Sequence, residues 1–143
     1  MASQLKVDTL TGVTTAGSID VTGEGNSTTT NLQQGLAKAW VTVNADESTV
    51  VAFDSFNVAS VQDDAAGKYG ITYTNNMNNA NYLSNGVASH HSTSSDHDRY
   101  ITGAQVGGSI DARRTTSLHK FGYLDSSFAD TFTAGSSVHG DLA

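Results

Sequence analysis

The sequence contains no cysteine and no proline, charged residues make up only 15% of it, and its apolar runs are short. Without cysteine the chain forms no disulfide, no zinc ribbon and no thiol nucleophile. Its longest apolar runs, such as Val50–Phe53, fall far short of the roughly 20 residues that a membrane-spanning helix needs. The first residues have neither a basic start nor an apolar core, so no secretory signal is expected. We therefore expect a protein made in a cytoplasm that stays there or leaves inside a larger particle.

Positive charge is also scarce. Seven Lys and Arg stand against 14 Asp and Glu, which gives a formal net charge of −7. Binding to nucleic acid needs a basic surface that neutralises phosphates, so the sign of the whole chain argues against such a partner. The charges are unevenly spread: residues 99–120 hold Arg99, Arg113, Arg114 and Lys120 against one carboxylate. This split favours a complementary subunit contact or a solvated loop.

What the sequence does have is a polar composition rich in Ser, Thr, Asn and Gly, interrupted by alternating apolar residues. A chain of 143 residues is long enough for one domain. Low charge combined with low hydrophobicity would suggest disorder in an isolated chain, but the alternation argues against that interpretation. A polar yet ordered chain often gains its missing burial from identical copies, so we expect a homo-oligomer.

Residues 1–39 are predicted to form an extended N-terminal arm with almost no aromatic content. Apolar positions alternate within Thr- and Gly-rich sequence, which predicts brief strands joined by turns at Gly12, Gly17 and Gly23. Such an arm cannot build a core alone, so we expect it to serve in anchoring and oligomerisation. The candidate anchoring residues are Leu5, Val7, Leu10, Ile19 and Val21.

One short helix is expected at the end of the arm. Thr28–Asn31 offers residues that cap helix N-termini, and Leu32, Leu36 and Ala39 then follow at helical spacing. The pattern predicts one or two turns, weakened by Gly35. The candidate contacts between copies, which form the trimer contact implied by the resemblance described below, are Leu32, Leu36 and Trp40.

From Trp40 onwards the sequence predicts a β module over residues 40–143. Short runs with strand alternation are separated by turns, with no helix between them, which indicates an antiparallel β-sandwich or jelly-roll-like module. Residues 63–67 are predicted to be a turn, and Gly86–Thr116 one or two long loops. The predicted strands are Trp40–Val43, Val50–Phe53, Phe56–Val61, Lys68–Thr74, Leu118–Leu124 and Phe128–Phe132.

The aromatic residues of this module divide into two predicted groups. Those on strand faces are expected in the core, namely Trp40, Phe53, Phe56, Tyr69 and Tyr73. Tyr82, Tyr100 and Tyr123 flank predicted loops, and a subunit contact is favoured for them over stacking on sugar rings. For Trp40 we expect full burial where the arm meets the sheet, with a cost of about 3–5 kcal/mol for Trp40→Ala.

One segment has the composition of a metal site. Ser89–Arg99 contains three imidazoles and two Asp carboxylates, and the weak candidate ligands are His90, His91, His97 and Asp98. Neither the i, i+4 spacing of helical zinc sites nor an alternating His-any-His pattern is present. An exposed polar loop is therefore favoured over a metal site.

No residue in the sequence stands out as catalytic. Serine is abundant, but no Gly-flanked nucleophile turn or oxyanion motif accompanies it. Asp63 and Asp64 lie on a predicted turn, where Asp is common for backbone reasons. Gly103–Gly108 lacks the lysine that follows a phosphate-binding loop. We expect no enzymatic activity and no cofactor.

Several segments are similar in sequence to one known group of proteins. Residues 5–12 and 17–23 are similar to its N-termini, and Gly35–Val41 is similar to a junction in which Lys-Ala-Trp precedes a strand. Residues 54–61, 67–74 and 77–82 are similar to its C-terminal module, and 138–143 to its ending. These segments resemble the short tail-fibre and appendage proteins of marine tailed bacteriophages. The resemblance is poor over Gly86–Thr116. It implies a β-rich homotrimer in the virion, with an anchoring arm, an outward module and no catalytic residues.

Three functions follow as hypotheses. The resemblance favours a fibre- or spike-type appendage subunit that contacts other virion proteins and a host surface glycan or protein. The shortness of the chain favours either a stubby fibre or a capsid decoration (cement) protein bound to the major capsid protein. A metal-dependent or glycan-cleaving enzyme built around the His-rich segment is the third hypothesis, and assaying the metal content would test it.

Overall fold

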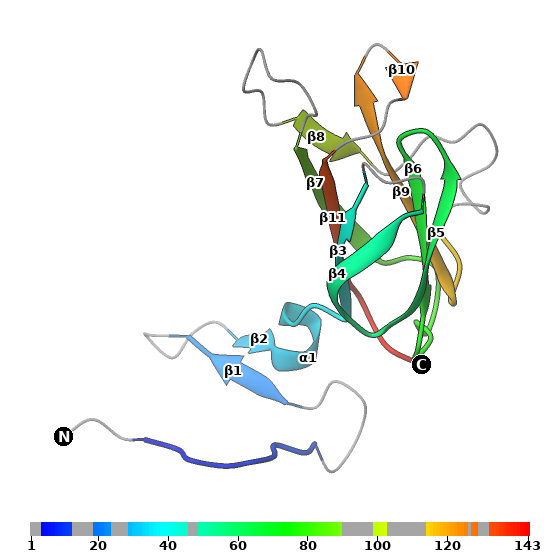
Figure 1. Cartoon of the computed structure of the whole chain (residues 1–143). Coiled ribbons are helices and arrows are strands. Elements are labelled where there is room, and N and C mark those ends of the chain that lie inside the picture. Colours follow the sequence, from blue (N-terminus) through cyan, green and yellow to red (C-terminus); the bar gives the residue numbers. More distant parts are fainter. Residues whose placement is uncertain are drawn as a thin grey trace. The chain divides into compact units, whose positions relative to one another are not determined.

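The computed structural model describes residues 4–12, 19–23, 29–45, 49–89, 99–102, 114–125, 127–128 and 132–143. The chain divides into two compact units, Met1–Leu36 and Ala37–Ala143 (Figure 1). Apart from one helical turn, the regular structure of the described residues is antiparallel β-sheet, which confirms the all-β prediction.

The first unit contains a small hairpin and that helical turn. β1 (Asp20–Thr22) pairs antiparallel with β2 (Thr29–Asn31). α1 (Leu32–Gly35) follows at once and confirms the short helix expected there. The Leu32 amide donates a hydrogen bond to the Ile19 carbonyl oxygen at 2.8 Å, which ties the start of the helix to the hairpin. Residues 4–12 belong to no strand pair among the described residues.

The second unit is one antiparallel sheet of nine strands. Its order is β4-β3-β11-β7-β8-β9-β6-β5, with β10 paired to β9. Figure 1 shows the sheet curling so that β3, β11 and β7 lie opposite β6 and β9, an arrangement consistent with a β-sandwich. The bounds are β3 Ala39–Asn44, β4 Val51–Phe56, β5 Val58–Ala65, β6 Lys68–Tyr73, β7 Leu83–Ser89, β8 Arg99–Thr102, β9 Leu118–Asp125, β10 Ser127–Phe128 and β11 Thr133–His139.

The core lies between the inner faces of the curled sheet. Successive strand residues point to opposite faces, so in a strand such as β3 every second side chain points inward, whereas the edge strands β4 and β5 are mostly exposed. Tyr69 and Tyr73 are buried, as the sequence predicts, and the Tyr69 ring lies 5.8 Å from that of Phe121. The core residues are Ala39, Val41, Val43, Ala45, Val50, Tyr69, Ile71, Tyr73, Met77, Tyr82, Ala88, Phe121, Ala134 and Val138.

Asn57 forms the corner between β4 and β5. Its φ of 57° lies in the left-handed region, which Asn tolerates better than most residues. Its side-chain amide donates to the carbonyl oxygens of Lys38 (2.9 Å) and Asn75 (3.0 Å). Its side-chain oxygen accepts from the Asn75 amide at 2.7 Å. These bonds hold the chain reversal in place.

Three strands occupy sequence that predicts loops or turns, and one of them, β8, lies wholly within the predicted loop Gly86–Thr116, where it pairs with β7 and β9. β5 continues through Asp63 and Asp64 to Ala65, so the turn predicted at 63–67 is wrong there; Gln62 and Asp63 instead pair with β6, and only Ala66 and Gly67 turn. β7 enters the predicted long loop as far as Ser89 and pairs with β11 along its whole length. The small residues of β7 have little local preference for a strand, and pairing with β11 and β8 on its two sides stabilises the strand conformation instead.

The prediction of core aromatics is partly wrong. Phe53 and Phe56 are 60% and 51% exposed, because β4 is an edge strand with a register shift opposite Thr42/Val43. Tyr82, expected at a subunit contact, is instead buried in the core. Of the predicted strand Phe128–Phe132, only Phe128 lies in a strand, at the end of β10; residues 129–131 lie outside the described residues, and Phe132 precedes β11 and is exposed. The side chains of Tyr100 and Tyr123 lie outside the described part of the structure.

Candidate functional site

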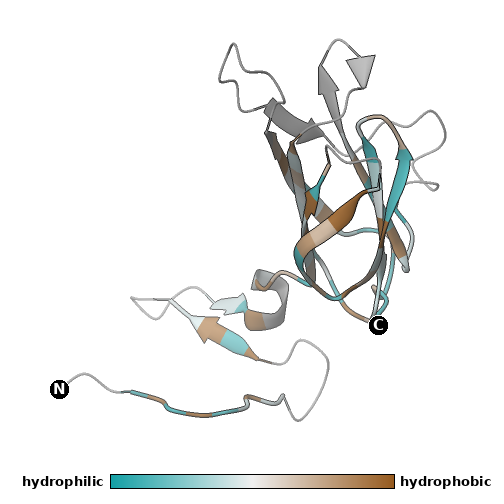
Figure 2. Cartoon of the chain, viewed as in Figure 1, coloured by the Kyte–Doolittle hydropathy of each residue, from teal (hydrophilic) through white to brown (hydrophobic). Residues whose placement is uncertain are grey.

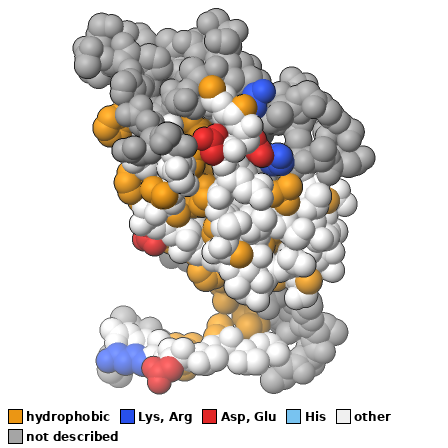
Figure 3. All heavy atoms as spheres, turned by 45° about the vertical axis from the view of Figure 1, so that its right-hand side comes forward, with side chains coloured by type: hydrophobic (Ala, Val, Ile, Leu, Met, Phe, Trp, Pro, Cys, Tyr) orange, Lys and Arg blue, Asp and Glu red, His pale blue; other side chains and the backbone are white. Residues whose placement is uncertain are grey.

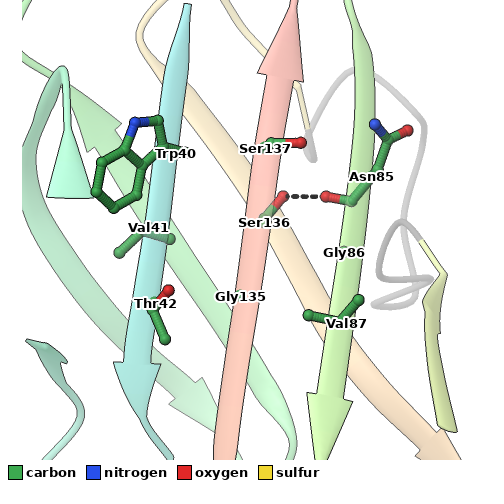
Figure 4. A pocket seen from close by; sticks show the side chains of 9 residues that line it. All are labelled: Trp40, Val41, Thr42, Asn85, Gly86, Val87, Gly135, Ser136 and Ser137. Atoms are coloured by element: carbon green, nitrogen blue, oxygen red, sulfur yellow. Dashed lines mark hydrogen bonds between the residues drawn. The ribbon is translucent and has the colours of Figure 1, made fainter. Parts of the chain in front are cut away.

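The outer face of β3, β11 and β7 carries a shallow hollow that we call the Trp40 hollow. The register places Trp40, Ser137 and Asn85 in one row across the three strands, and Thr42, Gly135 and Val87 in the next. Cross-strand partners project from the same face of a sheet, so both rows face away from the core. The hollow has a volume of about 270 Å³, and Figure 4 shows these side chains arranged around it.

Gly135 is the reason for the depression. A side-chain carbon at this position would lie 3.1 Å from the Val41 carbonyl oxygen, 3.8 Å from Thr42 Oγ1 and 3.9 Å from Val87 Cγ2. Any larger residue would therefore fill the space between Thr42 and Val87. The absence of a side chain in the middle of β11 creates a concave floor between two strands.

Trp40 lies beside this hollow rather than in the core, so the predicted full burial is wrong. In β3 the buried positions are Ala39, Val41 and Val43, which leaves Trp40 and Thr42 on the outer face. Trp40 is half-buried, and its cross-strand partner Phe56 is exposed. Together with Val87, which is 71% exposed, they make this face apolar.

The chemistry of the hollow suits contact rather than catalysis. Its lining consists of Trp, Val, Thr, Asn, Gly and Ser side chains, none of which ionises near neutral pH. A half-buried aromatic ring beside amide and hydroxyl groups is typical of protein contact surfaces. The sequence named Trp40 as a contact residue but gave no signal for Asn85, Gly135 or Ser137, which only the pairing of β7 with β11 brings beside it.

Inside the module, His119 and Ser136 form a buried pair. Their Nε2 and Oγ atoms lie 3.1 Å apart, and the Ser136 hydroxyl donates to the Asn85 carbonyl oxygen at 3.0 Å. Nε2 therefore carries the hydrogen that Ser136 accepts, and Nδ1 has no hydrogen-bond partner among the described residues. Burial, assisted by the charge of Arg114, lowers the pKa of His119 from 6.5 to about 4. The serine hydroxyl is buried and already donates to a carbonyl, so this pair has a structural role.

Arg114 and Tyr82 join a loop to the core next to this pair. The Arg114 guanidinium donates to the Tyr82 carbonyl oxygen at 2.7 Å and lies 5.8 Å from the centre of the Tyr82 ring. The Tyr82 hydroxyl donates to the Leu118 carbonyl oxygen at 2.9 Å. Burial is the main cause that raises the pKa of Tyr82. Arg114 therefore binds within its own module.

Lys120, the other described cation of the basic stretch, also has a partner inside the module. Its Nζ lies 2.9 Å from Asp64 Oδ2. The side chains of Arg99 and Arg113 lie outside the described residues, so only Arg114 and Lys120 are placed, and both interact with their own module.

The candidate metal ligands His90, His91, His97 and Asp98 all lie outside the described residues. Within the part of the chain that the structure describes, no group of three or more His, Asp or Glu side chains is placed to hold a metal ion. The same described residues include no helix that is long and apolar enough to cross a membrane.

The arm candidates are mostly solvent-exposed. Leu5 is 79% exposed, and Val7, Leu10 and Val21 are each exposed by half or more. Ile19 and Leu32 are half-buried near the hairpin, and Leu36 is exposed. These apolar side chains have little cover from the described residues of their own unit.

Comparison with protein-family models, with characterised proteins and with solved structures finds no match to this chain.

Proposed function

We propose that this protein is a non-enzymatic structural subunit of a tailed-phage virion, a homotrimeric fibre- or spike-type appendage attached through its N-terminal arm. Residues 1–39 serve as the anchoring and oligomerisation segment, and residues 40–143 form a β-sandwich module that faces outward to a host surface glycan or protein. The virion is then its location, and other virion proteins are its partners. The resemblance of the arm, the junction and residues 54–82 to phage appendage proteins is the starting point for this proposal.

The exposed apolar side chains of the arm are the observation that carries it. Leu5, Val7, Leu10 and Val21 sit on an extended segment and a hairpin with strands of three residues. A two-stranded hairpin of this size is at best marginally stable alone. Covering these residues requires another surface, which the virion or a neighbouring copy provides. Trp40, Leu32 and Leu36 are the residues we assign to the contact among three copies.

The polar groups inside the module support a structural role. His119, Ser136, Tyr82 and Arg114 bind one another or nearby carbonyl oxygens, and the lining of the Trp40 hollow holds no ionisable group. The surface drawn in Figure 3 is mostly uncharged, with apolar side chains exposed in separate places. Such a surface suits assembly contacts.

The test is a deletion of residues 2–30. We expect the truncated protein to stay folded, because the core residues all belong to Ala37–Ala143. It should fail to enter virions made without the full-length copy, and immunoblots of purified particles would measure this. Full-length protein expressed at the same level is the control. Normal incorporation of the truncated protein would show that attachment resides in the module instead.

A capsid decoration protein is the second candidate. It is favoured by the small extent of regular structure in the first unit, whose described residues form one hairpin and one helical turn rather than a repeated shaft. Electron microscopy of particles carrying a gold-labelled copy would separate the two: label on the tail supports an appendage, and label over the shell supports decoration.

A further inference from the structure

The sheet of the second unit ends in two unlike edge strands. β5 carries Asp63 and Asp64, and Asp64 forms the ion pair with Lys120. β4 instead exposes Val51, Phe53 and Phe56, by 49%, 60% and 51%. In Figure 2, β4 is largely brown, whereas the second half of β5 is teal. Charged residues on an edge strand discourage pairing with another chain. β5 has two adjacent carboxylates and β4 has only Asp54, so β4 is the less protected edge.

The free side of β4 also retains unused hydrogen-bonding capacity. β4 is the last strand of the sheet order, and among the described strands it pairs with β3 alone. The Ser55 amide donates at 2.8 Å to the side chain of its exposed neighbour Asp54 rather than to another strand. A backbone edge with apolar side chains and such an amide is suited to accept one more strand.

The arm contains a segment with matching properties. Residues 4–12 pair with no other strand among the described residues, and Leu5, Val7 and Leu10 are exposed. Lys6 stands between Leu5 and Val7 and forms no ion pair within the described part of the chain. Leu5 and Val7 therefore share one face of an extended strand, and Lys6 lies on the other.

We propose that residues 4–10 of one copy add as a strand to the β4 edge of a second copy of this chain. The opposite charges of Lys6 in the arm and Asp54 in β4 favour this segment as the added strand. Lys6 set beside Asp54 places Leu5 and Val7 beside Phe53 and Ser55, whichever way the strand runs. In that register Asp8 falls beside Ala52 or Phe56 rather than beside a carboxylate. The pairing sets Leu5 and Val7 beside the exposed Phe53 and gives the Ser55 amide a backbone partner.

The inference rests on the proposed function in one respect, because it also assigns the arm a role between copies. The proposed function and the pairing of the arm with β4 can be disproved by different experiments. Incorporation into virions tests attachment to the particle, whereas the pairing is tested on the purified full-length protein.

Disulfide cross-linking is the direct test, since the natural chain has no cysteine. Phe53→Cys in one full-length chain is mixed under mild oxidation with a size-tagged chain that carries Val7→Cys, its neighbour in an antiparallel pair, or Leu5→Cys, its neighbour in a parallel pair. Cross-strand neighbours lie about 4.5–5.5 Å apart at Cα, within disulfide range.

The matched control replaces Phe53→Cys with Phe132→Cys, at an equally exposed Phe outside β4. We expect at least about tenfold more hybrid dimer with Phe53→Cys than with Phe132→Cys for one of the two arm variants. Equal yields from Phe53→Cys and Phe132→Cys with both arm variants overturn the proposal.

A charge exchange identifies the second copy as the occupant. Lys6→Glu and Asp54→Lys should each weaken self-association in sedimentation equilibrium by roughly two- to fivefold per contact. Mixing the two variants should restore association, because the glutamate introduced in one chain then meets the lysine introduced in the other, and the natural Lys6 meets the natural Asp54. Thermal melts verify that the variants are folded.

Two outcomes of this exchange overturn the proposal. One chain can carry both Lys6→Glu and Asp54→Lys. If this double variant recovers the wild-type behaviour but the mixture of the two single variants does not, the arm pairs with its own module. A wild-type chain that stays monomeric at all concentrations means that no second copy is bound.

Discussion

The two units of this protein are made from similar polar sequence, yet among the described residues only those of the second unit form a core. In Met1–Leu36 the apolar residues of the extended segment are exposed by more than half. In Ala37–Ala143 the same kind of alternation leaves Val41, Val43 and Ile71 at most 2% exposed. The two units differ in the number of sheet layers that can pack against each other. β1 and β2 form a hairpin of three-residue strands, whereas β3, β11 and β6 enclose a common interior. Alternation makes strands, and a second layer makes a core.

The largest expected effect comes from the centre of that interior. Phe121 is 1% exposed and lies between Tyr69 and His119, with ring centres 5.8 Å away in both cases. Phe121→Ala should lower the free energy of unfolding by about 3–5 kcal/mol, because it leaves a cavity that cannot collapse. Leu10→Ala, in the arm, should change it by less than about 0.5 kcal/mol. Urea unfolding of both variants measures the contrast. Equal losses would mean that the arm is part of the folded core.

A second test uses pH. Burial lowers the pKa of His119 to about 4, below its ordinary value of 6.5. Between these two pH values the imidazole is therefore protonated in the unfolded chain and neutral in the folded chain. Stability from this residue is complete above pH 6.5 and is lost as the pH falls towards 4, by up to about 3 kcal/mol. Unfolding free energies between pH 4 and 7 would show this slope, and His119→Gln should flatten it. An unchanged slope in the variant would assign the effect to other groups.

The smallest effect is expected at the outer face. Trp40 is half-buried beside the hollow, so Trp40→Ala should cost the isolated chain about 1–2 kcal/mol rather than the roughly 3–5 kcal/mol expected from full burial. Its fluorescence should be quenched by iodide partly, between a free peptide and a core residue. Trp40→Phe, which keeps an aromatic ring on this face, is the matched control and should lose less. Complete shielding in the dilute protein would mean that Trp40 is already covered.

Strand periodicity predicted some elements better than others. β3, β6 and β9 were found because Val, Ile, Tyr and Phe alternate in them. β11, with the sequence Thr-Ala-Gly-Ser-Ser-Val-His, was missed because small residues give no local signal. It nevertheless lies between β3 and β7, where small side chains fit between neighbours on both sides. The hollow was unpredictable for the same reason, since Gly135 is its floor.

Phe53 and Phe56 illustrate the opposite error. Both are strong strand formers, and the sequence places both in strands. It groups Phe56 with Val58–Val61, however, whereas Phe56 ends β4 and the chain turns at Asn57. Whether such a residue is buried depends on which face and which edge its strand occupies, and β4 is an edge with a register shift. Periodicity gives the alternation but not the side on which the second layer lies.

The sequence by itself determined the all-β class, the short helix at Leu32–Gly35 and the inward positions of Tyr69 and Tyr73, because these depend on spacing along the chain. Only the tertiary structure decided that Trp40 faces outward, that β7 and β11 pair, that His119 meets Ser136 and that β4 is left as an apolar edge. These features join residues far apart in the chain, and the order of strands in a sheet is set by packing between layers rather than by any local preference.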